Sequence, residues 1–124
     1  MYYERLSLEV IAAKSHWQIV NPPILTGRSG VTHRFDFMAM NGQQRLAFDI
    51  CERPSETDVI KTFIKRFDTG VSAYIVSLSG KMAAGAGKLA TEYGLKILHS
   101  NSIESAFRTR DLEPQSRSHS LAAA

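Results

Sequence analysis

The chain has 124 residues, of which 44% are hydrophobic and 22% are charged, and its formal net charge is +3. This length suits one domain with one modest core, and the composition excludes a disordered or low-complexity chain. The single cysteine, Cys51, excludes an internal disulfide and a cysteine-based zinc cluster. The small positive charge permits an anionic partner but does not require one.

The sequence predicts a protein with no membrane partner. Its apolar runs are far shorter than the roughly 20 residues that a membrane-spanning helix needs. The first ten residues, MYYERLSLEV, place an acid and a base where a signal peptide needs an uninterrupted apolar stretch, so we expect a cytoplasmic location. Residues 1–110 are expected to form a single domain, and the polar, then alanine-rich residues 111–124 a disordered tail.

The first predicted element is a helix over residues 2–15, where apolar side chains recur at helical spacing. A short strand over 17–20 follows. Two longer strands, over 31–40 and 43–52, are joined at Asn41-Gly42, and this dipeptide is the strongest short-range signal for a β-hairpin.

A second helix is predicted to begin at the N-cap residue Ser55 and to end before Gly70. Its apolar stripe, which we expect to face the core, consists of Val59, Ile60, Phe63, Ile64 and Phe67. The remaining predicted elements are a strand over 71–78, a helix over 81–93, a strand over 95–98 and a short helix with Ile103, Ala106 and Phe107. The order α-β-β-β-α-β-α-β predicts an α/β fold with a mixed central sheet flanked by helices.

The hairpin carries two aspartates, Asp36 and Asp49, in otherwise apolar strands. If Asn41-Gly42 is a two-residue loop, Met40 pairs with Gln43, and both aspartates lie on one face of the ribbon. They would then be diagonal neighbours with alpha carbons about 7–8 Å apart, within reach of one Mg²⁺ ion. The opposite face is the predicted core side, and it carries His33, Phe35, Phe37, Leu46, Phe48 and Ile50.

The face with the two aspartates has a second interpretation as a salt-bridged outer surface. Arg34 would face Asp49 across the ladder, and Asp36 would pair with Arg34 or Arg45. Such ion pairs are common on exposed strands, so the hairpin alone leaves both interpretations open.

A helix with an acid, a hairpin with an aspartate on each strand, and then helix-strand-helix-strand resemble the PD-(D/E)XK restriction-endonuclease-like superfamily. The stretches GRSGVTHRFDF, AFDI and KRFDTG resemble its small archaeal and bacterial Mrr-like domains, over roughly residues 1–100. This resemblance implies a restriction-endonuclease-like αβββαβ core. In active members, an aspartate of the first strand and an acid of the second hold Mg²⁺, and a lysine two residues after that acid helps to position the attacking water. A glutamate of the first helix often completes the site.

Carried over to this chain, the resemblance assigns Asp36 and Asp49 as metal ligands and Glu4 as the helical glutamate, with Glu9 as the next candidate. The lysine position holds Cys51, which departs from the superfamily pattern. A neutral thiol supplies no positive charge to a phosphate and cannot orient hydroxide as an ammonium group does.

Some superfamily members carry the lysine on the following helix, where this chain has Lys61 and Lys65 one turn apart. Either lysine would restore the missing positive charge. Both lysines also fit a solvated helix face beside Asp58 and Asp68, because these acids lie at helical spacing from them.

Two functions follow from the resemblance. The first is a nuclease that hydrolyses DNA phosphodiester bonds with Mg²⁺, or Mn²⁺, and a migrated lysine; the second is a catalytically inactive nuclease-fold module that binds DNA or a protein partner in a regulatory role. Arg28, in the loop over residues 26–30, and Arg34 are the candidate contacts to nucleic-acid phosphates. A small domain with one active site is expected to form a homodimer in order to cut both strands of a duplex.

Overall fold

A mixed five-stranded sheet with the strand order β1-β4-β5-β6-β7 is the centre of the fold. The computed structural model describes residues 2–100, 103 and 107, with side chains from residue 8 onward. Antiparallel pairing joins β1 (Gln18–Ile19), β4 (Phe37–Asn41) and β5 (Gln44–Cys51). Parallel pairing joins β5 to β6 (Ser72–Ser77) and β6 to β7 (Ile97–His99).

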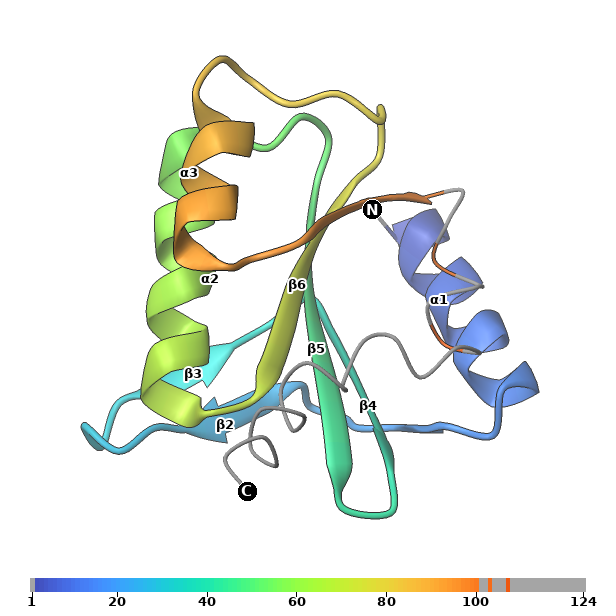
Figure 1. Cartoon of the computed structure of the whole chain (residues 1–124). Coiled ribbons are helices and arrows are strands. Elements are labelled where there is room, and N and C mark those ends of the chain that lie inside the picture. The colour runs from blue at the N-terminus through green and yellow to red at the C-terminus, as the bar shows by residue number, and fades with distance from the viewer. Residues whose placement is uncertain (1, 101–102, 104–106, 108–124) are drawn as a thin grey trace, which may run out of the picture.

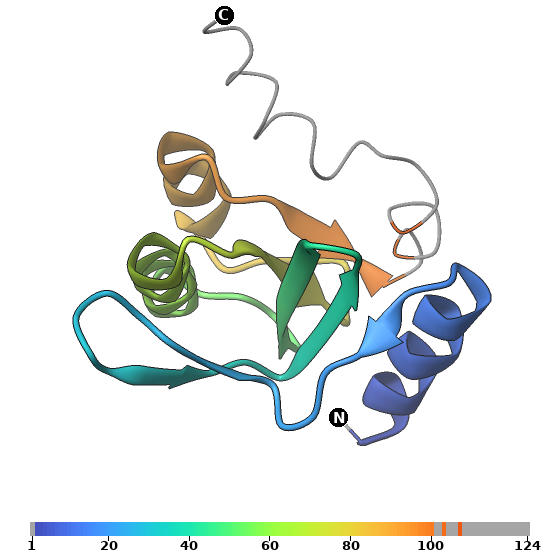
Figure 2. The same ribbon diagram turned by 90° about the horizontal axis from the view of Figure 1, so that it is seen from below.

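Helices cover both faces of this sheet. Figures 1 and 2 show α1 (Tyr2–Lys14) on one side, and α2 (Glu56–Thr69) and α3 (Ala86–Tyr93) on the other. Among the strands of this sheet and its helices, the chain order α1-β1-β4-β5-α2-β6-α3-β7 confirms the predicted α/β fold, a mixed central sheet flanked by helices. No described helix combines the length and the apolar character that crossing a bilayer requires.

Both faces of the β4-β5 hairpin carry fully buried residues, so the interpretation of the aspartate face as an outer surface is wrong. Phe37 and Phe48 pack on the side of α1, with Ile103 and Phe107. On the opposite side Met38 and Ala47 are fully buried, in a cluster that includes Val71 and Ala73. The parallel strands β5 and β6 need cover on both faces, and α2 and α3 supply it on the side of the aspartates.

The single strand predicted over 31–40 is also wrong. β3 (Thr32–Arg34) instead pairs with β2 (Ile24–Thr26), a strand that the sequence did not predict, in a separate two-stranded ribbon. The chain changes partners at Phe35 and Asp36: the Phe35 N–H donates to the Pro23 carbonyl (2.8 Å) and the Asp36 N–H to the Phe48 carbonyl (3.0 Å). This change of partner interrupts the alternation of side chains between the two faces of the strand. Phe35 therefore packs with Met38 and not with Phe37.

The hairpin loop is shifted by one residue from its predicted place. Asn41 pairs with Gln44, so the two loop residues are Gly42 and Gln43, and Met40 faces Arg45 where Gln43 was predicted. Gly42 has a φ of 64°, and a glycine at the first loop position fits a type II′ turn.

The predicted start and end of α2 are confirmed, but the prediction of which side of the helix faces the core is wrong. Ser55 and Asp58 form a reciprocal capping box, and Gly70 ends the helix in a left-handed conformation. Of the predicted core stripe only Val59 is fully buried, whereas Ile60, Ile64 and Phe67 are exposed. The polar Thr62 is buried in their place.

The last elements differ from the prediction mainly at their starts. α3 begins at Ala86, five residues later than predicted, after Gly85 adopts a φ of 85°. β7 begins at Ile97, two residues later than predicted. Ile103 and Phe107 are helical and buried, while Ala106 and the predicted tail over 111–124 lie outside the described residues.

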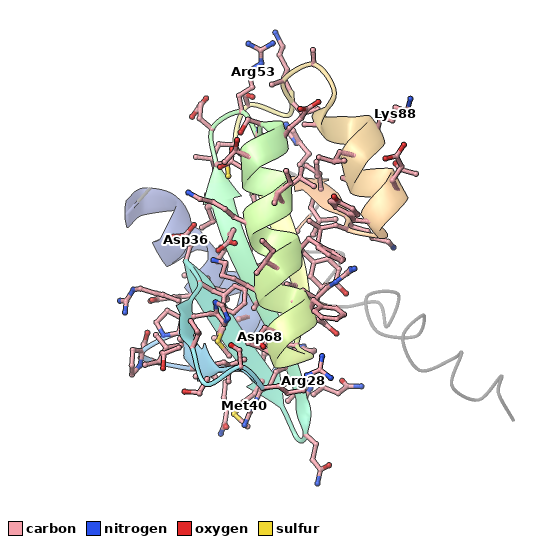
Figure 3. The ribbon with its side chains drawn as sticks, turned by 90° about the vertical axis from the view of Figure 1, so that its left-hand side faces the viewer. Arg28, Asp36, Met40, Arg53, Asp68 and Lys88 are labelled. Carbon is pink, nitrogen blue, oxygen red and sulfur yellow. The ribbon has the colours of Figure 1, made fainter. Side chains whose placement is uncertain are left out.

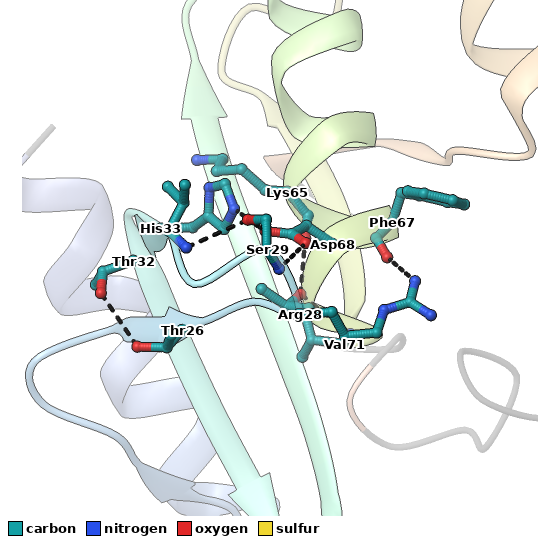
Figure 4. A network of polar contacts seen from close by, with 11 residues as sticks. Thr26, Arg28, Ser29, Thr32, His33, Lys65, Phe67, Asp68 and Val71 are labelled. Atoms are coloured by element: carbon teal, nitrogen blue, oxygen red, sulfur yellow. Dashed lines mark hydrogen bonds and ion pairs between the residues drawn. The ribbon is translucent and has the colours of Figure 1, made fainter.

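Asp68 fastens the β2-β3 ribbon to the C-terminal end of α2 (Figure 4). Its carboxylate accepts hydrogen bonds from the Ser29 N–H (3.0 Å) and the Ser29 hydroxyl (2.6 Å), and it pairs with His33 Nε2 (2.7 Å). His33 therefore faces α2 and not the core side that the sequence predicted. Gly27 lets the ribbon approach this closely, since a Cβ there would lie 2.0 Å from Asp68 Oδ2.

These contacts lower the pKa of Asp68 from its ordinary value of 3.8 to about 2, chiefly through the hydrogen bonds from Ser29 and His33. The carboxylate therefore stabilises the folded chain above pH 3.8, and the contribution is lost as the pH falls toward about 2. We expect Asp68→Asn to lower the melting temperature at neutral pH, and the gap to the unchanged protein to close in this acid range.

Thermal unfolding followed by circular dichroism between neutral pH and pH about 2 checks this expectation. Glu52→Gln, the same kind of change at an exposed acid outside this network, controls for the loss of one negative charge. A gap that stays constant throughout the acid range would contradict the role of Asp68.

Candidate active site

A pocket of about 270 Å³ lies between β5 and α2. Five of its lining residues are predicted site residues, namely Arg34, Asp36, Asp49, Lys61 and Lys65. Ile50, Cys51, Asp58 and Thr62 complete the lining. The fold thus gathers both predicted metal aspartates and both candidate lysines around one space.

A larger hollow of about 480 Å³ lies elsewhere, beside the β4-β5 turn and Trp17. The described residues that line it include no acid, histidine, lysine or cysteine, and Arg45 is its one ionisable group. The smaller pocket is therefore the candidate active site, because it holds the groups that hydrolytic chemistry needs.

Asp49 is held through both oxygens of its carboxylate. It projects from β5 toward α2, and 13% of its side chain is exposed. The Thr62 hydroxyl donates to Oδ2 (2.6 Å), and the Lys65 ammonium lies 3.0 Å from Oδ1 and 2.9 Å from Oδ2. Both carboxylate oxygens are thus engaged by α2, and the Arg34 that was predicted to face Asp49 instead pairs in register with Ile24 of the ribbon.

Lys65 is held by three neighbours at once. Besides Asp49, its ammonium donates to the Arg34 carbonyl (2.7 Å) and lies 4.5 Å from the centroid of the Phe35 ring. Lys61, one turn earlier, is exposed at the rim of the same pocket. The geometry separates the two lysines, because Lys65 contacts the aspartate and Lys61 faces solvent.

Asp36 lies at the bend between β3 and β4, beside Asp49. Its backbone N–H bonds the Phe48 carbonyl, and its Oδ2 accepts the Ile50 N–H at 2.6 Å. Phe48 and Ile50 are the neighbours of Asp49 in β5, so Asp36 lies directly opposite Asp49. The sequence had predicted a diagonal relation between the two aspartates. The prediction that they share one face holds, because the true pairing differs from the predicted one by two residues and therefore preserves the face.

Cys51, two residues after Asp49, is half-buried beside three carboxylates. Burial is the largest cause that raises the pKa of its thiol. Together with the charges of Asp58, Asp49 and Asp36 and a hydrogen bond with Asp58, it raises this pKa to about 12. A thiol with this pKa stays neutral near pH 7, so Cys51 is neither a thiolate ligand nor a nucleophile there.

Among the predicted site residues whose side chains are described, Arg28 does not join this group. Arg28 lies at the C-terminal end of α2, where its guanidinium donates to the Phe67 carbonyl (2.8 Å) and lies 5.4 Å from the Phe67 ring centroid. In Figure 3, Arg28 and Asp68 lie at that end of α2 and Asp36 lies further toward the other end. Glu4 is part of α1, but its side chain is not among those described, and Glu9 does not line the pocket.

Thr62 is the functional candidate that sequence reasoning missed. It is 1% exposed, and it lies three residues before Lys65, so both side chains share one face of α2. The sequence offered one signal for this role: Thr62 lies three residues after Val59, so it shares the side of the helix on which Val59 is buried. Within the described chain, no three histidine, cysteine, aspartate or glutamate side chains form a metal-holding group, so the pocket offers the Asp36–Asp49 pair.

Comparison with known proteins supports the fold. No family model and no curated protein matches the sequence. The structure is similar to the protein of unknown function AF1548 (TM-score 0.63, 14% identity, covering 79% of this chain and 56% of that one). It is also similar to protein VC1899 from Vibrio cholerae (TM-score 0.52, 12% identity, covering 89% and 31%).

These similarities show a common fold at low identity, and this chain spans little more than half of AF1548 and a third of VC1899. A structure of EndoMS in complex with double-stranded DNA aligns with a TM-score of 0.48 at 12% identity, covering 77% of this chain and 42% of that one. That score is too low for the likeness to support a conclusion about this chain.

The hydrogen bond from Thr62 to Asp49 gives a stability prediction. We expect Thr62→Val to lower the free energy of unfolding by about 1.5–3 kcal/mol, because it removes a hydrogen bond to a charged and mostly buried carboxylate. Thr62→Ser keeps the hydroxyl and is expected to recover most of that loss. Urea unfolding of the three proteins measures the differences, and a Val variant as stable as the unchanged protein would contradict this role for Thr62.

The raised pKa of Cys51 gives a reactivity prediction. At pH about 8, a pKa of about 12 leaves roughly one thiol in ten thousand ionised, so iodoacetamide should alkylate Cys51 very slowly. Asp58→Asn removes a neighbouring charge and should accelerate alkylation, whereas Glu52→Gln, outside the pocket, should not. Mass spectrometry over a pH series provides the rates, and a rate that levels off at pH about 9 would show an unperturbed thiol.

Proposed function

We propose that this domain is a metal-dependent DNA nuclease in which α2, and not β5, supplies the active-site lysine. The observation that carries the proposal is the Lys65 ammonium within 3.0 Å of Asp49, in a pocket that also contains Asp36. A positive group beside a pair of carboxylates is the combination that phosphodiester hydrolysis requires. Cys51 then needs no catalytic role.

The two aspartates fit Mg²⁺, with Mn²⁺ as a substitute. Both are hard oxygen donors that line the same pocket, and Mg²⁺ in proteins is commonly held by one or two carboxylates, with water and substrate phosphate as its other ligands. Bound there, the ion would lower the pKa of a water molecule and neutralise charge on the scissile phosphate.

The protein groups around the aspartates have distinct tasks. The Thr62 hydroxyl fixes the orientation of Asp49, and the Ile50 N–H fixes that of Asp36. Lys65 would donate to an anionic oxygen of the substrate, the part that a neutral thiol at position 51 cannot play. Lys61 and Arg34, exposed at the rim, would attract the phosphate backbone, while participation of Glu4 stays a prediction.

A second function is a catalytically inactive module that binds DNA, or a protein partner, in a regulatory role. One observation favours it: Lys65 and Thr62 already engage both oxygens of Asp49, which gives the pocket its own counter-ion. In that case the rim charges of Lys61 and Arg34 would hold DNA without cutting it.

Cleavage assays distinguish the two functions. Labelled single-stranded, duplex and branched DNA are incubated with the protein and Mg²⁺ or Mn²⁺. We expect cleavage that Asp49→Asn abolishes and that Lys65→Met slows by about 100-fold or more in kcat, as loss of one charge-stabilising group does. Lys61→Met is the matched comparison and should mainly raise KM.

Equal losses of kcat in Lys61→Met and Lys65→Met would contradict the assignment of Lys65. Salt-sensitive DNA binding without cleavage would instead support the inactive module. We also propose that the nuclease acts as a homodimer, because one pocket supplies the groups for one strand and a duplex has two.

A further inference from the structure

α2 exposes a row of large apolar side chains. Ile60 is 40% exposed, Ile64 is 52% exposed and Phe67 is 66% exposed, and their spacing of four and three residues aligns them along one side of the helix. Scattered exposed apolar residues are ordinary on protein surfaces, but a contiguous row marks a contact surface. We refer to these three residues as the outer stripe.

The rest of α2 is already occupied by its own chain, so the outer stripe is the remaining side. Val59 and Thr62 face the sheet, and Phe63 stacks on Tyr93 of α3 with ring centroids 4.4 Å apart. Lys65 faces the pocket. Figure 3 views α2 from the side away from the sheet, and no described segment lies across it there.

We propose that the outer stripe is the contact surface of a symmetric homodimer in which the α2 helices of two copies pack antiparallel about Ile64. This arrangement makes the stripe complementary to itself: Ile64 meets Ile64 at the two-fold axis, and Ile60 meets Phe67 of the other copy. A surface that pairs with its own copy needs this reciprocity.

The charges along α2 favour the antiparallel direction. Its first turn carries the acids Glu56 and Asp58, and its last turn carries Arg66 and the acid Asp68, which pairs with His33. Arg28 adds a further positive charge at the last turn, where its guanidinium packs over the Phe67 ring, so positive charge outweighs negative charge at that end. Antiparallel packing brings the acidic end of each helix to the basic end of the other, whereas parallel packing would bring like charges together.

Arg28 and Phe67 also form a preordered anchor at the C-terminal end of the stripe. The guanidinium is fixed both by the ring and by the Phe67 carbonyl, so little side-chain freedom would be lost when two copies meet. Aromatic and arginine side chains are the types enriched in protein interfaces.

The antiparallel dimer also bears on the proposed function, and this step rests on it. Lys61 and Lys65 lie about 100° around the helix from Ile60 and Ile64, so the pocket occupies a flank of α2 beside the stripe. The two-fold axis of an antiparallel helix pair runs perpendicular to the helices and to the line that joins them. It therefore carries both pockets to the same side of the dimer, where one duplex can contact both.

Cysteine cross-linking tests this geometry independently of any nuclease activity. In a Cys51→Ser background, Ile64→Cys should form a disulfide dimer under mild oxidation, because it lies at the two-fold axis. Ile60→Cys alone should cross-link poorly, and so should Phe67→Cys alone, but a mixture of the two should cross-link well. Efficient cross-linking of each of the three single variants would instead indicate parallel packing and overturn the proposal.

Sedimentation of the otherwise unchanged chain over a concentration series supplies the second measurement. We expect a dimer whose dissociation constant rises by at least tenfold in Ile64→Glu. Val10→Glu is the matched control, because Val10 is 57% exposed on α1, away from the stripe, and circular dichroism verifies that each variant is folded. A monomer at every concentration, or a dimer that Ile64→Glu leaves unchanged, would overturn the proposal whether or not the protein cuts DNA.

Discussion

The contact between Asp49 and α2 sets the arrangement of this half of the molecule. A carboxylate on a helix-covered face of a sheet is costly unless hydrogen bonds and an opposite charge compensate it. Thr62 and Lys65 provide both, from adjacent turns of one helix. α2 must therefore lie on the sheet with its polar Thr62 facing inward, although a more apolar side was available.

Two properties of the structure follow from that rotation of α2. The Lys65 ammonium lies against Asp49, so a pocket bordered by both charges opens along the flank of the helix. The side that carries Ile60, Ile64 and Phe67 turns away from the sheet and stays exposed. The pocket and the outer stripe thus both follow from the contacts of Thr62 and Lys65 with the Asp49 carboxylate.

The success of sequence reasoning here depended on whether a feature was local. The capping box at Ser55 and the end of α2 at Gly70 were predictable, because they are set by residues within a few positions of each other. The rotation of α2 was not, since apolar periodicity points to the wrong side when a distant strand presents a carboxylate. The break at Phe35 and Asp36 was equally hidden, because their N–H groups bond Pro23 and Phe48 and no glycine or proline marks the change. Asp36 and Asp49 were brought together correctly because the side-chain period of a strand tolerates an error of two residues.

The position of Cys51 acquires a physical explanation from the same helix. Asp36, Asp49 and Asp58 concentrate negative charge around it, and Lys65 already supplies an ammonium group from α2. A small neutral side chain suits the remaining space, where it packs beside the cluster of Val59 and Ile75. α2 is also tied to the β2-β3 ribbon through Asp68 and to α3 through Phe63, so the helix that carries Lys65 is held by the sheet, the ribbon and α3 together.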